Sequence, residues 1–478
     1  MAESLRRNSL AGLGWAFGQQ AGSQLSRVVF SILLARILSP ADYGLLGLGL
    51  LCVNFLQILS TFGLGDGLIQ LGRQAEEAEL AALFRLHATL ALGTACLLAL
   101  AAPAVAAWYR LEDLTDILRL LALTFVFSIG VVVPRAALEK RLRFQTVARR
   151  AVPATLLSGL LALAAAHAGW GVYSLVVLAL AEPALLAISL LPWIPRARPA
   201  PLRQLLPVLH YSWKLSVAGV VGFVGKNIDA VVIGRWIGPR DLGLYQLGFR
   251  LTRLPSQNLA GVLDRVLFPA YASIQDDRPR VARAYVRVLR GMSWLMFPLM
   301  TLAAFSLERL APLLLTHKWD GVVPVMQVFC VLAVVQTMGR SMNAVIQALG
   351  RSDVVLVWVF FAAPLNIAAV ALSARWGILA VAVALVATRL LIQLGQQHVI
   401  ARLLGVPHGR LLRAEFAGLP FCLALAGLQG LTGLAGWHPW LRLSVLSLAT
   451  LLPPALLLAA RGRQGALAWL AGDSPQRG

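Results

Sequence analysis

The sequence predicts an all-α polytopic membrane protein with about fourteen transmembrane helices. Of its 478 residues, 59% are apolar and only 13% are charged, whereas a soluble globular chain carries about 25% charged residues. About 282 apolar residues, at about 20 for each span, are enough for about fourteen spans. The remaining residues make short loops and leave no room for a sizeable soluble domain.

Apolar segments bounded by charged residues or by Pro and Gly clusters give the individual spans. The basic N-terminus is followed by a polar segment without a cleavage motif, so we expect a retained first span and no signal peptide. An even number of spans places both chain ends on one side. The predicted spans cover residues 10–37, 43–65, 80–107, 116–134, 150–167, 171–193, 208–237, 243–270, 291–315, 322–349, 353–374, 376–401, 413–433 and 442–460.

The distribution of basic residues predicts the orientation. A net charge of +21 would suggest a nucleic-acid partner for a soluble protein, but in a membrane protein basic residues collect in cytoplasmic loops, so we predict no nucleic-acid partner. With a cytoplasmic N-terminus, the inside segments hold 25 of the 42 basic residues and the outside loops hold 8. Both termini are therefore predicted to be cytoplasmic.

An internal repeat predicts two parallel halves. Residues 35–50, ARILSPADYGLLGLGL, align without gaps with residues 234–249, GRWIGPRDLGLYQLGF, with seven identities in sixteen positions. Both copies follow an odd-numbered span, so the halves are related by an axis along the membrane normal. In the shared Pro-x-Asp-x-Gly core, Pro suits a turn, Asp suits a helix cap and Gly allows tight packing. We predict an N-lobe over 1–203, a C-lobe over 204–405, and spans 13–14 with a cytoplasmic tail over 406–478.

Polar residues recur on single faces of several spans. In the first span Gln20, Gln24 and Arg27 share one helical face, and Arg27 aligns with Lys226 at the repeat offset of 199. A charge at membrane depth costs about 2.5–3.5 kcal/mol on insertion scales and usually faces a cavity or a partner. We therefore expect these faces to line a water-filled cavity between the lobes. The other members of this set are Arg250, Arg253, Asp264, Arg340, Asn343 and Arg389.

The intramembrane charges have a positive surplus. Their obvious deep acidic partners are Asp229 and Asp264, while Glu182 is less clearly placed. A positively charged cavity suits a phosphate or pyrophosphate, which Arg binds in bidentate fashion. Asp229 and Asp264 are also candidates for ion coupling, as is Asp66 in the GLGDG segment that ends span 2.

Two structural alternatives stay open for these polar residues. Each group can simply pair with another, as Lys226 with Asp229 one turn away. The arginines of spans 8 and 12 can instead snorkel toward an interface. Arg27, Lys226 and Arg340 therefore rank above the snorkelling candidates, which are Arg250, Arg253 and Arg389. The sequence contains no Walker A motif, GxSxG motif or paired-carboxylate cluster, and its histidines lack metal-ligand spacing. We predict no catalytic residue, no metal site and no cofactor.

Three segments make the chain resemble a known family: the Gln-rich first span ending in LLARILSPADYGLLGLGLL, the FGLGDGLIQ segment, and the basic loop at 135–150. It resembles the polysaccharide-transporter branch of the multidrug/oligosaccharidyl-lipid/polysaccharide exporter superfamily, which contains the Wzx-type O-antigen and colanic-acid flippases. The resemblance implies two six-helix lobes that open alternately to either side of the bacterial inner membrane.

The resemblance also implies a substrate and partners. The protein is expected to flip undecaprenyl-pyrophosphate-linked oligosaccharide from the cytoplasmic to the periplasmic leaflet for O-antigen, exopolysaccharide or capsule synthesis. The energy would come from an ion gradient or the membrane potential. Expected partners are the lipid-linked oligosaccharide, the phospholipid membrane, a polysaccharide polymerase and a chain-length regulator. By the same resemblance, pyrophosphate binding falls to Arg27 and, through the repeat, to Lys226.

Three other functions compete with this interpretation. A cation-coupled drug antiporter of the same superfamily needs a deep acidic residue, whereas the surplus here is positive. A membrane polymerase, ligase or glycosyltransferase normally needs a large outer loop or a cytosolic nucleotide-sugar domain, and the predicted loops are short. A scramblase-like protein would equilibrate lipid without coupling, and a test of gradient dependence separates it from a coupled flippase.

Overall fold

The computed structural model describes residues 2–61, 77–141, 143–201, 206–434, 438, 441 and 444–450. Throughout these ranges the regular structure is helical, with no strand. The predicted all-α polytopic architecture is confirmed.

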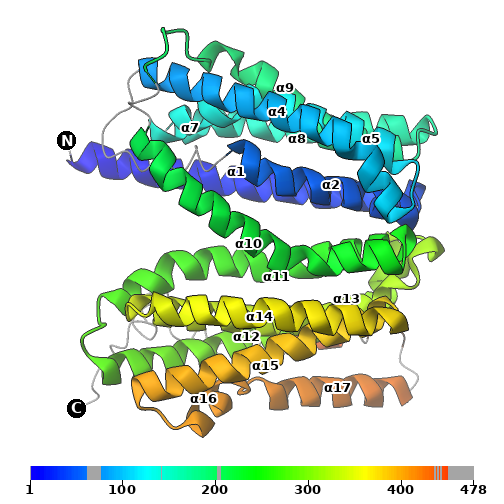
Figure 1. Ribbon diagram of the computed structural model, residues 1–478. Helices are drawn as coiled ribbons and strands as arrows, with labels where there is room; N and C mark the ends of the chain where they lie inside the picture. Colours follow the sequence, from blue (N-terminus) through cyan, green and yellow to red (C-terminus); the bar gives the residue numbers. More distant parts are fainter. Residues whose placement is uncertain are drawn as a thin grey trace. The chain divides into compact units, whose positions relative to one another are not determined.

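The chain forms two compact units, Met1–Gln246 and Leu247–Gly478. In the first unit α1 packs along α8, α8 packs along α9, and α2 packs on α4 and α10 (Figure 1). The helices of this unit are α1 (Ala2–Ile37), α2 (Pro40–Thr61), α4 (Glu77–Tyr109), α5 (Leu114–Leu121), α6 (Leu123–Ile129), α7 (Val132–Lys140), α8 (Phe144–His167), α9 (Val172–Leu190) with the 3-10 turn η1 (Leu191–Trp193), and α10 (Leu206–Trp236).

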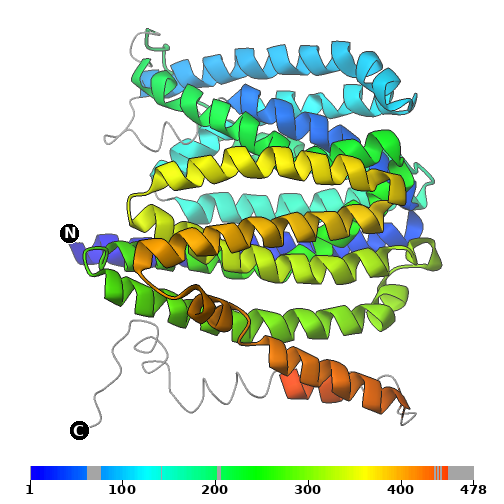
Figure 2. The ribbon, with the colours of Figure 1, turned by 60° about the horizontal axis from the view of Figure 1, so that its bottom comes forward.

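The second unit is built on α12, α13 and α15, which pack in succession (Figure 2). Its buried core joins methionines, valines and leucines of these helices around Tyr285 and Met338. Helix α11 (Pro239–Ala272) begins in the first unit and continues into the second. The others are α12 (Arg278–Leu314), η3 (His317–Trp319), α13 (Val322–Ala348), α14 (Ser352–Ser373), η4 (Ala374–Trp376), α15 (Ile378–Leu404), α16 (His408–Glu415) and α17 (Leu419–Leu434).

Thirteen of the fourteen predicted spans coincide with helices of the described chain, and most of the fourteenth, 442–460, lies outside it. Among the residues that the structure describes, nine helical segments are long and apolar enough to cross a membrane by length and composition. Helices α1, α10, α11 and α14 are not in that set.

Two predicted spans are interrupted. Span 4 is divided into α5, α6 and α7, with Ala122 between the first two helices and Gly130 and Val131 between the last two. Span 13 is divided into α16 and α17, where the backbone N–H of Gly418 donates to the Ser293 hydroxyl on α12 (2.9 Å). Side-chain contacts of this kind are invisible to a hydropathy pattern.

The two copies of the repeat form similar helix–turn–helix units. Helices α1 and α2 are joined by Leu38 and Ser39, and α10 and α11 are joined by two residues as well. The lobe boundaries at 203 and 405 come from this repeat and stay predictions. The compact units are instead divided after Gln246, because α10 packs against α2.

The copies also touch each other reciprocally within the first unit. A Cβ added at Gly44 would overlap the carbonyl oxygen of Pro239, and a Cβ added at Gly243 would overlap that of Pro40. Both glycines are therefore required by a close backbone approach. This explains the glycine of the Pro-x-Asp-x-Gly motif in both copies.

Candidate functional site

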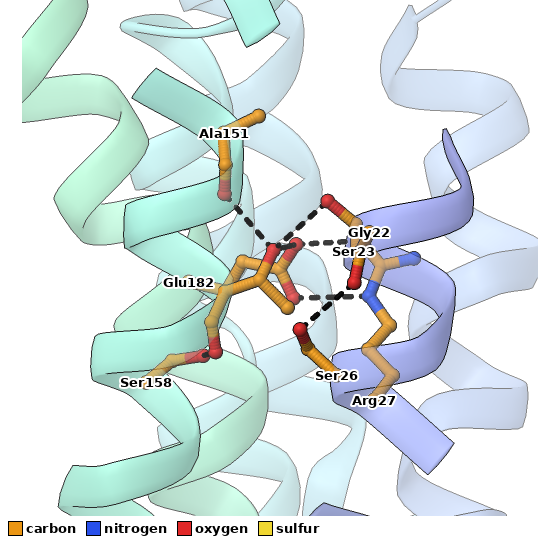
Figure 3. Close-up of polar contacts among 8 residues, drawn as sticks. Gly22, Ser23, Ser26, Arg27, Ala151, Ser158 and Glu182 are labelled. Carbon is orange, nitrogen blue, oxygen red and sulfur yellow. Dashed lines mark hydrogen bonds and ion pairs between the residues drawn. The ribbon is translucent and has the colours of Figure 1, made fainter. Parts of the chain in front are cut away.

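Arg27 on α1 is bound to Glu182 on α9. Its Nη2 lies 2.5 Å from Glu182 Oε1 and its Nε donates to Oε2 over 3.3 Å, a bidentate pair (Figure 3). The sequence left the position of Glu182 open, and the structure makes it the partner of Arg27. More than half of the Arg27 side chain, 54%, stays exposed, against 25% for Glu182.

A small polar network positions Glu182. Thr155 on α8 contacts Glu182 Oε1 over 3.1 Å, and its hydroxyl also lies 3.4 Å from that of Ser23 on α1. Figure 3 shows Arg27 of α1 on one side of Glu182, and Ala151 and Ser158 of α8 on the other. Three helices therefore hold one carboxylate against the guanidinium of Arg27, with its orientation fixed by a bidentate geometry.

Lys226, the repeat equivalent of Arg27, has different surroundings. It is exposed on α10. The buried Asp229 carboxylate accepts a hydrogen bond from Tyr245 (2.6 Å) and one from the backbone N–H of Ala230 (2.9 Å). Within the described residues, Tyr245 and Ala230 are therefore partners of Asp229, and the pairing of Asp229 with Lys226 stays a prediction.

The amides of the first span accompany Arg27 along α1. Gln20 is exposed and Gln24 is half-buried. Their role in substrate binding stays a prediction. Asp66 lies outside the described residues.

Two arginines of the second unit lie within electrostatic range of a third. Arg253 on α11, Arg340 on α13 and Arg389 on α15 lie close enough for the charges of the latter two to act on Arg253. The Arg253 guanidinium stacks over the Phe249 ring at 5.2 Å, and that ring packs edge-on against Phe329 of α13 (5.2 Å). Cation–π contact holds an arginine in place without neutralising it. Three helices of the second unit thus each place an arginine in one electrostatic neighbourhood.

The other predicted residues of the second unit lie near this group in sequence. Arg250 is exposed one turn before Arg253, and Asn343 is half-buried one turn after Arg340. Asp264 lies on α11, but its side chain is outside the described residues. The structure therefore places Arg340 within electrostatic range of Arg253. From the sequence alone, Arg340 ranks above Arg253 as a candidate for substrate binding.

An apolar cavity of about 400 Å³ lies in the first unit between α2, α4 and α10. Leu51, Phe55, Leu97 and Phe223 are among its lining residues. Its walls offer almost no hydrogen-bonding groups, so it suits hydrocarbon better than sugar.

Sequence reasoning missed two buried acidic residues, Glu79 on α4 and Glu415 on α16. Glu415 is 3% exposed at the end of α16 and accepts hydrogen bonds from the side-chain amides of Gln393 and Gln397 on α15. Span 13 was predicted to begin at 413, which made Glu415 look like a flanking charge. The i, i+4 spacing of the two glutamines was the available signal, because it puts both amides on one face.

Comparison with known proteins identifies the family. Residues 33–324 match the family model described as "Polysaccharide biosynthesis protein". The chain belongs to this family. Among its relatives, the lipopolysaccharide biosynthesis protein WzxC of Escherichia coli is 24% identical over 362 residues, which are 73% of this chain and 72% of WzxC. The succinoglycan biosynthesis transport protein ExoT of Rhizobium meliloti is 27% identical over 303 residues, 63% of this chain and 60% of ExoT.

A solved structure shows the fold of this polysaccharide biosynthesis protein. The lipid II flippase MurJ in an inward closed conformation matches with a TM-score of 0.72 at 11% identity, over 93% of this chain and 99% of MurJ. The agreement extends through both units and establishes a MurJ-like helical fold.

Proposed function

We propose that this polysaccharide biosynthesis protein flips an undecaprenyl-pyrophosphate-linked oligosaccharide from the cytoplasmic to the periplasmic leaflet by alternating access. Family membership and the MurJ-like fold support a role in moving a lipid-linked glycan precursor. The observation that carries the proposal is that Arg340 and Arg389, on α13 and α15, lie within electrostatic range of Arg253 on α11.

The arginine group suits the pyrophosphate. Like charges gathered in a medium of low dielectric constant repel one another, so an anion that enters between them is bound strongly. Each guanidinium presents a planar fork of donors that matches two phosphate oxygens.

Arg27 supplies the corresponding group in the first unit. In the observed state Glu182 occupies its fork. A phosphate that reaches the exposed part of Arg27 competes with Glu182 for the same donors, so substrate binding and the release of α1 from α9 are linked. Lys226 is exposed and contributes charge without bidentate geometry.

The location and partners follow from this role. The protein works in the bacterial inner membrane with both termini in the cytoplasm, as the distribution of Lys and Arg predicts. A polysaccharide polymerase and a chain-length regulator would take over the flipped precursor. The drug antiporter remains the second candidate, because that branch of the superfamily shares the fold. A gathering of arginines disfavours it, since a cationic drug would be repelled.

A proteoliposome assay tests the proposal. A fluorescent undecaprenyl-pyrophosphate oligosaccharide is followed between leaflets for the native protein, Arg340→Ala and Arg253→Ala, with Arg309→Ala as a control at an exposed arginine. Loss of one charged hydrogen-bonding pair costs about 1.5–3 kcal/mol, so we expect the flipping rate to fall by about ten- to a hundred-fold in the first two variants.

Three outcomes decide between the candidates. Native rates in both variants would exclude the arginine group as the pyrophosphate site. A rate that Arg340→Lys restores in part would support a requirement for charge and a further requirement for the bidentate fork. Transport of an organic cation by folded protein that flips no lipid would favour the antiporter.

A further inference from the structure

Glu415 is a carboxylate buried without a cation. It lies at the end of α16 with 3% of its surface exposed, and the side-chain amides of Gln393 and Gln397 donate to its two oxygens. None of the basic residues that the structure describes pairs with it. This contrasts with Glu182, whose charge is matched by Arg27.

The groups facing Glu415 come from the two helices packed on α16, which are α12 and α15. Helix α12 presents the fully buried Tyr285, close enough for the charge of Glu415 to act on it, with Tyr271 of α11 beside it. Helix α15 presents the two glutamine amides. Arg413, two residues away on α16, is exposed.

An ionised carboxyl is costly in these surroundings. Two amide dipoles offset only part of the desolvation of a full charge, whereas a neutral carboxylic acid is buried at little cost. The surroundings therefore favour proton uptake. Amide N–H groups that point at the carboxylate also disfavour a metal cation, which would need oxygen ligands in their place.

Two buried polar atoms of residues around Glu415, Gln397 Oε1 and the Tyr285 hydroxyl oxygen, are without a hydrogen-bond partner in the described structure. A carboxylic acid carries one O–H donor that a carboxylate lacks. Rotation of the Gln397 amide by half a turn would present Oε1 to that new donor. The same side chain can thus donate to the ionised form and accept from the protonated one.

We propose that Glu415 is a proton-binding site that couples the flippase to a proton gradient. Uptake forms an O–H bond on one carboxyl oxygen, and release breaks that bond and returns the proton to water, with no other bond changed. The hydrogen bond between Gln397 of α15 and Glu415 of α16 differs between the ionised and the protonated form. Proton binding therefore acts on the contact between these two helices. The coupling role rests on the proposed flippase function, but proton binding itself does not.

The test compares Glu415→Gln with Glu308→Gln in the full-length protein. Gln keeps the shape of the protonated acid and cannot release a proton. Glu308 is a matched control, because it also accepts from a glutamine amide, that of Gln327 (3.2 Å), but is exposed. Two quantities are measured: the infrared band of protonated carboxyl groups as a function of pH, and the leaflet distribution of the fluorescent lipid-linked oligosaccharide under an imposed pH gradient.

For one proton per cycle, a gradient of one pH unit should drive about a ten-fold asymmetry of lipid between the leaflets in the native protein, because one unit is a ten-fold ratio of protons. The asymmetry should reverse with the gradient, persist in Glu308→Gln and vanish in Glu415→Gln, which still equilibrates lipid. The infrared spectrum of Glu415→Gln should lack a carboxyl band that the native protein and Glu308→Gln share.

Each contrary result has its own meaning. A gradient-driven asymmetry that survives in Glu415→Gln overturns the coupling role, and identical infrared spectra in all three proteins overturn proton binding. A native protein that moves no lipid-linked oligosaccharide contradicts the proposed function instead. In that case the infrared comparison alone decides whether Glu415 binds a proton. The variant Gln397→Leu gives a second check, since it should weaken the pH dependence of the same band.

Discussion

The two copies of the repeat agree in their backbone and differ in their polar partners. Both place a proline at the start of the second helix and both use a glycine to approach the proline of the other copy. Yet the cation of the first copy, Arg27, is bound to Glu182, whereas Lys226 of the second is exposed. The shared part is the scaffold, and the divergent part is where substrate handling is expected.

The tyrosines that connect the two helices of each copy also differ in their partners. Tyr43 ties α2 to α1 through the carbonyl oxygen of Ser31 (2.6 Å), while Tyr245 ties α11 to α10 through the Asp229 carboxylate (2.6 Å). Each copy therefore uses a tyrosine to fix its helix pair, but with an acceptor of different charge. Stability measurements on paired variants can quantify how far the copies differ.

The largest effect is expected at the reciprocal glycines. Replacing Gly44 or Gly243 by Ala places a methyl group against a backbone carbonyl, which cannot move aside as a flexible side chain could. Each substitution should therefore destabilise the protein by about 2–3 kcal/mol. The control is Gly93→Ala on α4, where a Cβ meets nothing within 4 Å. Equilibrium unfolding in mixed micelles gives the difference. Unequal losses at the two glycines would contradict the reciprocity.

The tyrosine variants should rank next. Tyr245→Phe removes a hydrogen bond to a carboxylate and should cost about 2 kcal/mol, whereas Tyr43→Phe removes one to a neutral carbonyl and should cost about 1 kcal/mol. The same unfolding measurement applies. Equal costs would show that Asp229 is protonated or already satisfied by its other partners.

The smallest effect is expected at the helix caps. Ser39 and Asp42 form a reciprocal capping box at the start of α2, in which the Ser39 N–H and hydroxyl both donate to the Asp42 carboxylate (2.8 and 2.7 Å). Asp42→Ala should cost about 1 kcal/mol. The second copy has Gly238 where Ser39 stands and lacks the hydroxyl, so Asp241→Ala should cost only about 0.3 kcal/mol through the helix dipole.

A double variant checks that interpretation of the first cap. Ser39→Ala combined with Asp42→Ala should cost no more than Asp42→Ala alone, because both substitutions remove the same interaction. Additive losses would mean that the two residues stabilise α2 separately.

The sequence predicted the helices far better than the contacts among their polar groups. Hydropathy places a span because about 20 apolar residues in a row have one stable environment, and so thirteen spans coincide with helices. Which polar side chains pair with each other depends on which helices pack together. A single sequence does not give the distances between helices. Arg27 was correctly placed on a polar face, but its bond to Glu182, 155 residues away, follows from the packing of α1, α8 and α9.

Glu415 shows the same limit from the other side. In the sequence, a glutamate near the end of an apolar segment looks like a charged residue that flanks a span and faces water. Glu415 is an interior residue only because α16 packs against α12 and α15. The breaks at Gly130 and Gly418 also escaped the hydropathy pattern, because each depends on local backbone or side-chain hydrogen bonds.

The mutual contact of Gly44 and Gly243 also bears on the history of the gene. Each glycine meets the proline carbonyl of the other copy, which is the isologous pattern found at the two-fold axis of a homodimer. A half-length ancestor that dimerised would have contained this contact already, made by two identical chains. After duplication and fusion, neither glycine could change without moving the opposite backbone, while Ser39 and Gly238 were free to diverge.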